Sequence, residues 1–193
     1  MEVEIGIGKS GRRAYGFDDI AIVPSRRTRD PEDVDISWDL DAFHFELPLI
    51  GSAMDGVISP QTAILMGQLG GMGCLNLEGI WTRYADPEPI LEEIAQLSPE
   101  KATARMQQLY LEPIKEELIG QRIREIKDAG VTACASLTPQ RVAQFSKYVL
   151  EADLDILVVQ GTVVSAEHVS KTVEPLNLKK FIREFELPVI VGG

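Results

Sequence analysis

Five short apolar runs mark the chain from Leu47 onward, and each of them ends in small or polar residues. Runs of this length that are rich in Val, Ile, Leu, Ala and Cys are typical of parallel strands buried on both faces. The first run opens the stretch Leu47–Asp55, and the other four are Gly73–Asn76, Val131–Ser136, Asp155–Gln160 and Pro188–Gly192.

Helical patterns separate these runs. Ser59-Pro60 and Thr138-Pro139 each combine a capping residue with a proline at the first helical position, which predicts a helix start at both places. Apolar residues at helical spacing predict four main helices, which are Pro60–Leu69, Pro113–Ala129, Pro139–Leu150 and Leu176–Glu186. A helical insertion around residues 77–112 is expected to hold two more, Pro89–Leu97 and Pro99–Leu111.

This alternation predicts an α/β fold, and two architectures suit it: a doubly wound open sheet and a (β/α)₈ TIM barrel. No Gly-x-Gly-x-x-Gly follows the first strand, which disfavours the open sheet of a dinucleotide-binding domain. We therefore expect a TIM barrel, of which this chain supplies about the first five β/α units. A barrel has eight strands and usually takes about 250 residues, so the chain is expected to be the first part of a longer protein.

Residues 1–46 are expected to form an N-terminal arm and an outer ribbon, and residues 47–193 the barrel part. Residues 1–30 look irregular, although Phe17–Pro24 alternates weakly and could form a short strand. Asp33–Trp38 and Ala42–Phe45 are each expected to be extended. The arm carries a group of arginines that we expect to be solvated and paired with acidic neighbours rather than to bind phosphate: Arg12, Arg13, Arg26, Arg27 and Arg29.

The chain has 193 residues and a formal net charge of -11, which argues against nucleic-acid or membrane binding as its main activity. A nucleotide ligand is still compatible with that charge, because a local basic spot can bind phosphate. No signal peptide or membrane-spanning run is present, so a cytoplasmic location is expected. Cys74 and Cys134 lie inside apolar runs and are expected to be buried thiols rather than a disulfide or a metal pair.

Polar or small residues end each predicted strand, and in a barrel they would all face the same end. Amide and hydroxyl groups suit hydrogen bonding to a polar planar ligand better than acid–base chemistry. Any one of them alone would be expected only to satisfy backbone groups where a strand becomes a loop, but together they favour a ligand site. The five residues are Ser52, Asn76, Ser136, Gln160 and Gly192.

Residues that usually carry catalysis are sparse. The two histidines, His44 and His168, are far apart, and we expect His44 in the outer ribbon and His168 at a solvent-facing helix start. No metal-ligand spacing, no Gly-x-Ser-x-Gly elbow and no phosphate-binding Gly-Lys-Ser/Thr loop is present, and Gly8-Lys9-Ser10 is a chance match to the last of these. A nucleophile or base is therefore expected outside this sequence.

Three motifs together resemble the IMP dehydrogenase/GMP reductase family: Phe17–Pro24, Ser52–Val57 and Gly70–Asn76. The resemblance implies a (β/α)₈ barrel that binds a purine nucleotide monophosphate and a nicotinamide cofactor, NADP(H) or NAD(H). In that family a cysteine attacks C2 of the purine, and hydride passes to or from the nicotinamide. The cysteine lies on a loop after the sixth strand, so it is expected beyond Gly193, and neither Cys74 nor Cys134 takes its role.

The resemblance also implies roles for individual residues. Ser52 and Met54 match positions that line the nucleotide pocket, and Asp55 is expected to order the loop. The cofactor-binding positions correspond to Gln160, Gly161, Thr162 and Gly193. The family's dehydrogenases often have an aspartate and serines at the first of these places, and an asparagine at the last.

The dehydrogenases usually carry two regulatory CBS modules after the second strand, for which residues 77–130 leave no room. The chain therefore resembles a CBS-lacking branch of the family, and GMP reductases also lack the modules. We favour NADPH-dependent reductive deamination of GMP to IMP, with oxidation of IMP to XMP as the near alternative. A purine-nucleotide-sensing barrel without turnover is a third possibility. Family resemblance also suggests a homotetramer or a larger assembly.

Overall fold

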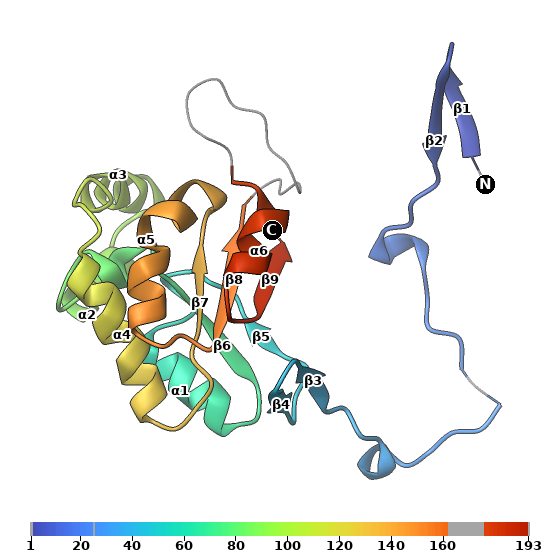
Figure 1. The fold of residues 1–193 in the computed structure, drawn as a ribbon, viewed down its shortest axis with the longest axis horizontal. Coiled ribbons are helices and arrows are strands. Elements are labelled where there is room, and N and C mark those ends of the chain that lie inside the picture. The colour runs from blue at the N-terminus through green and yellow to red at the C-terminus, as the bar shows by residue number, and fades with distance from the viewer. Residues whose placement is uncertain (1, 25, 162–175, 193) are drawn as a thin grey trace. The chain divides into compact units, whose positions relative to one another are not determined.

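The computed structural model describes residues 2–24, 26–161 and 176–192, and the chain forms two compact units (Figure 1). The first unit is Met1–Asp35 and the second is Ile36–Gly193. In the described part of the chain, no helix is both long and apolar enough to cross a bilayer.

The first unit contains a hairpin that the sequence pattern did not predict. Strands β1 (Glu2–Gly6) and β2 (Lys9–Arg12) pair antiparallel, and Gly8 takes the positive φ of 68° in the turn between them. The expected strand at Phe17–Pro24 is wrong, because residues 17–19 form a short 3-10 helix, η1 (Phe17–Asp19). A second short helix, η2 (Pro31–Asp33), follows. The weak alternation failed as a signal because these apolar side chains are exposed and pack against no neighbouring sheet.

The second unit begins with a small hairpin of β3 (Trp38–Leu40) and β4 (Phe43–Phe45), which pair antiparallel. The rings of Trp38 and Phe45 stack with their centroids 4.9 Å apart. The Trp38 indole Nε1–H donates to the Leu47 carbonyl oxygen at 3.0 Å, which ties the hairpin to the chain that enters the main sheet.

The main sheet has five parallel strands in sequential order, as predicted. They are β5 (Ile50–Gly51), β6 (Met72–Asn76), β7 (Cys134–Leu137), β8 (Ile156–Gln160) and β9 (Val189–Gly192). A doubly wound sheet would reverse its strand order at a switch point, and this sheet does not. The second unit is therefore a curled half of a (β/α)₈ barrel (Figure 1).

The helices lie close to their predicted positions. Four of them pack against the outer side of the sheet: α1 (Pro60–Gln68), α4 (Glu116–Asp128), α5 (Pro139–Glu151) and α6 (Leu178–Glu184). The insertion holds η3 (Ile80–Thr82), α2 (Glu88–Ala95) and α3 (Pro99–Leu109). The guanidinium of the buried Arg122 on α4 donates to the carbonyl oxygens of Trp81 (3.0 Å) and Ala85 (2.7 Å), which holds the insertion on α4.

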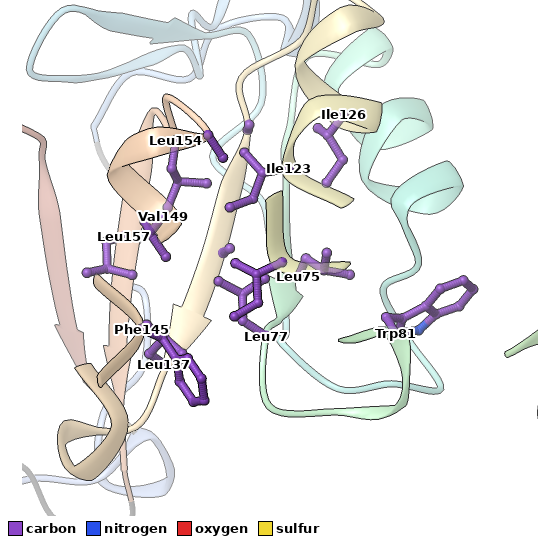
Figure 2. Packing of buried hydrophobic residues seen from close by; sticks show 14 of the residues in the cluster. Leu75, Leu77, Trp81, Ile123, Ile126, Leu137, Phe145, Val149, Leu154 and Leu157 are labelled. Atoms are coloured by element: carbon purple, nitrogen blue, oxygen red, sulfur yellow. The ribbon is translucent and has the colours of Figure 1, made fainter. Parts of the chain in front are cut away.

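Alternate residues of each strand build two different cores. Leu75, Leu137 and Leu157 point outward and pack against helical side chains such as Ile123 and Val149 (Figure 2). The intervening residues belong to a second cluster, on the concave side of the sheet, that includes Phe45 of the hairpin; its strand members are Met72, Cys74, Cys134 and Ile156. Both cysteines are buried and free, which confirms the prediction.

Candidate functional site

The inner side of the sheet ends in polar side chains. Asn76 lies in register with Ser136 on the neighbouring strand, and Gln160 lies in register with Gly192. Because side chains alternate between the two faces of a strand, Asn76 shares the inner face with Cys74 two residues earlier. The same count places Ser136 beside Cys134 and Gln160 beyond Ile156. The predicted strand-end residues therefore lie at one end of a parallel sheet.

A cavity of about 410 Å³ opens at this end of the sheet. Its size falls within the usual range of small-molecule sites. Three strands and the loops that follow them contribute to its wall, which offers amide, hydroxyl and carboxylate groups. The lining residues are Ala53, Asn76, Glu78, Ser136, Leu137, Thr138, Gln160 and Gly161.

A second, smaller hollow of about 260 Å³ lies next to it and shares Ala53 and Gln160 with it. Ser52 and Gly192 line this hollow, so all five strand-end residues contribute to one of the two spaces. Gln160 lies between the two, and its amide can donate to a ligand in one space and accept from a ligand in the other.

The residues implied by the family resemblance differ in whether they line these two hollows. Ser52 and Gln160 line the hollows, and Gly161 lines the larger one. The Met54 side chain is 54% exposed and lines neither of these two spaces. Thr162 and Gly193 lie outside the described residues, as does His168.

Asp55 organises the loops beside the cavity. Its carboxylate accepts hydrogen bonds from the Ile80 backbone N–H at 2.7 Å, from the Asn76 side-chain amide at 3.2 Å and from the Tyr110 hydroxyl. Its backbone carbonyl accepts from the Trp81 indole N–H at 3.3 Å. Asp55 therefore orders its loop, as expected, and also joins that loop to the helical insertion.

Tyr110 closes this arrangement from the end of α3. Burial and the hydrogen bond to Asp55 raise the pKa of its phenol, so the hydroxyl stays protonated and donates to the carboxylate. The Arg83 guanidinium lies over the Tyr110 ring, 5.2 Å from its centroid. Tyr110 thus helps to fix the loop after β5, although it lies 55 residues away from Asp55 in the sequence.

Sequence reasoning missed three lining residues, Ala53, Glu78 and Thr138. Glu78 lies two residues after the end of β6, and Thr138 directly follows β7. The available signal was their place just beyond a strand end, where ligand-binding groups of a barrel gather.

The described residues offer no familiar catalytic set. No group of three or more His, Cys, Asp or Glu residues that could hold a metal occurs among them. A hydrogen bond with Cys74 and burial raise the pKa of the Cys134 thiol, which disfavours the reactive thiolate. His44 lies on the β3–β4 hairpin, where its Nδ1 is 2.7 Å from Asp39 Oδ1.

Comparison with known proteins decides the family. The model of the IMP dehydrogenase/GMP reductase domain matches residues 14–193. The chain belongs to the IMP dehydrogenase/GMP reductase family. This membership agrees with the half-barrel and with the three sequence motifs that resemble the family.

Relatives match over nearly the whole chain. An uncharacterized oxidoreductase of Mycolicibacterium smegmatis is 43% identical over 196 residues, which is 99% of this chain and 52% of the relative. A crystal structure of an IMP dehydrogenase/GMP reductase-like protein from Corynebacterium glutamicum has a TM-score of 0.87 and 41% identity, and covers 100% of this chain and 52% of that one.

A more distant relative carries a more specific name. The inosine-5'-monophosphate dehydrogenase of Methanocaldococcus jannaschii is 37% identical over 65 residues, which is 34% of this chain. The relatives from Mycolicibacterium smegmatis and Corynebacterium glutamicum match nearly the whole of this chain, and the chain spans about half of their length.

Proposed function

We propose that this chain forms the nucleotide-binding half of a purine nucleotide oxidoreductase that converts GMP to IMP and ammonia with NADPH. The observation that carries the proposal is the cavity at the carboxyl ends of β6, β7 and β8, lined by amide and hydroxyl groups, in a member of the IMP dehydrogenase/GMP reductase family. Active sites of (β/α)₈ barrels lie at this end of the sheet.

The residues at the two hollows suit two ligands that lie side by side. Ser52 lines the smaller hollow, and we assign it to the purine nucleotide together with Met54, which follows it on the same loop but lines neither hollow. We assign Gln160 and Gly161 to the cofactor, together with Thr162 and Gly193 from outside the described residues. An amide and a hydroxyl can both donate and accept hydrogen bonds, which fits the carboxamide of a nicotinamide and the edge of a purine.

In this reaction ammonia would leave purine C2 when the cysteine sulfur adds there, and a bound reduced nicotinamide would supply the hydride that then replaces the sulfur at C2. The described residues bind and orient the two ligands, so that their contribution is proximity rather than proton transfer. The cysteine that attacks C2 is expected outside this chain, in the second half of the barrel. Glu78 is the acidic side chain in the wall of the larger cavity, and its carboxylate already accepts a hydrogen bond from the Thr138 backbone N–H.

Oxidation of IMP to XMP with NAD is the second candidate. The similarity to the Methanocaldococcus jannaschii enzyme, which is named an inosine-5'-monophosphate dehydrogenase, favours it. The insertion at residues 77–112 favours GMP reduction instead, because it holds η3, α2 and α3 and leaves no room for CBS modules.

Two absorbance assays that follow the reduced nicotinamide separate the candidates. We expect the full protein, which joins this chain to the rest of its barrel, to oxidise NADPH with GMP faster than it reduces NAD with IMP. Turnover only with IMP and NAD would make the protein an IMP dehydrogenase. Turnover in neither assay, with tight binding of purine nucleotides, would support a nucleotide-sensing barrel.

A further inference from the structure

Glu78 gives the larger cavity its charge. Among the described residues that line this space, Glu78 alone carries an ionised side chain, and the others offer amide, hydroxyl, apolar or glycine surface. A single carboxylate in such a wall has a strong effect on which part of a ligand can lie beside it, because it accepts hydrogen bonds and repels phosphate.

Hydrogen bonds to three different segments fix Glu78 in place. Its backbone N–H donates to Asn76 Oδ1 at 3.0 Å, and its backbone carbonyl accepts from Arg83 Nη2 at 3.0 Å. Its side-chain Oε1 accepts from the Thr138 backbone N–H at 2.5 Å. The carboxylate is therefore held across the gap between the loop after β6 and the start of α5, and it needs little reorganisation to bind a ligand.

The same contact changes the electrostatics of the start of α5. Thr138 is the N-cap residue of that helix. A helix N-terminus attracts anions, because its first N–H groups lack partners within the helix and its dipole is positive there. The Glu78 carboxylate already occupies this position, so this wall disfavours a phosphate group and favours a neutral group with hydrogen-bond donors.

We propose that Glu78 determines cofactor binding by accepting a hydrogen bond from a hydroxyl of the ribose that carries the nicotinamide. The proposal rests on the proposed function. Glu78 shares the cavity with Gln160 and Gly161, the residues assigned to the cofactor. Because a bound nicotinamide would have to meet the purine at the strand ends, the ribose attached to it would be the part of the cofactor nearest this wall.

The replacement Glu78→Gln tests this in the full protein. Glutamine keeps an oxygen for the Thr138 N–H, but it loses the charge and presents an amide donor where a ribose hydroxyl needs an acceptor. We expect the dissociation constants of NADPH and NADH, measured by the fluorescence of the reduced nicotinamide, to rise about tenfold. The dissociation constant of GMP, measured by calorimetry, is expected to stay the same.

Glu92→Gln is the matched control, because Glu92 is an exposed residue of α2 and the replacement changes the net charge equally. This control should bind both cofactors like the wild type. Unchanged cofactor binding in Glu78→Gln would overturn the inference, and so would tighter binding of NADPH, which would put a phosphate beside the carboxylate. An equal loss of GMP affinity would move Glu78 to the nucleotide side and overturn it as well.

A second measurement uses the wild-type protein, so its outcome does not depend on whether a Glu78 variant folds. A cofactor analogue that lacks the hydroxyls of the nicotinamide ribose should bind the wild-type protein about tenfold more weakly than the cofactor itself. Equal binding of the analogue and the cofactor would contradict the inference. Failure of the wild type to bind any nicotinamide cofactor would instead refute the proposed function on which the inference rests.

Discussion

Replacement of Asp55 by alanine is expected to lower the free energy of unfolding by about 3 kcal/mol. The variant removes the acceptor for the Ile80 N–H, the Asn76 amide and the Tyr110 hydroxyl at once. Leaving a buried donor without a partner costs about 1–3 kcal/mol, and more when the lost partner is charged. Urea unfolding, followed by the fluorescence of Trp81 beside this loop, measures the change.

Two other variants test whether the loss of stability comes from the Asp55 carboxylate. Asp55→Asn keeps one carbonyl oxygen as an acceptor and should lose less stability than Asp55→Ala. Asp86→Ala changes an exposed aspartate of the insertion and should alter the free energy of unfolding by less than about 0.5 kcal/mol. Equal stability of Asp55→Ala and Asp86→Ala would show that the Asp55 contacts do not hold the insertion to the loop after β5.

The replacement Gly73→Ala is expected to cost about 3 kcal/mol, because α1 packs directly on β6 at this point. A Cβ atom at Gly73 would lie 2.6 Å from the Cα atom of Ala63 and 2.9 Å from its Cβ atom. Backbone cannot give way as a flexible side chain can, so the helix has to move away from the sheet. Thermal or urea unfolding of the full protein measures the loss.

Gly56→Ala is the matched control for this substitution. A Cβ at Gly56 would meet no atom within 4 Å, and its backbone does not adopt a positive φ. Its free energy of unfolding should change by less than about 1 kcal/mol. Comparable stability of Gly73→Ala and Gly56→Ala would mean that α1 does not approach β6 so closely.

The barrel architecture was predictable because its signals are local. Each strand is a short apolar run, and Ser59-Pro60 marks a helix start that the structure confirms, with Ser59 Oγ accepting from the Thr62 N–H at 3.0 Å. The order of the strands then agrees with the tendency of consecutive strands to lie side by side. Asn76, Ser136 and Gln160 could be grouped for the same reason.

The remaining features depend on contacts between distant residues. Asp55 and Tyr110 meet although they are 55 residues apart in the sequence, with α1, β6 and most of the helical insertion between them, and no local pattern indicates that contact. Glu78 and Thr138 come together only because β6 and β7 are neighbours in the sheet. The β1–β2 hairpin was missed because its strands are short and exposed, and because β2 has no apolar side chain to match Val3 and Ile5 of β1.

The proposed function depends most on binding of the purine nucleotide at the carboxyl ends of the strands. A crystal structure of the full protein with GMP tests it directly. We expect the purine beside Ser52, in the hollow that Ser52 and Gln160 line. Another cavity, also of about 410 Å³ and distinct from the two hollows at the strand ends, lies at the opposite end of the sheet, beside Gly70 and Gly130. GMP bound there, with the strand-end cavity empty at saturating GMP, would contradict the account.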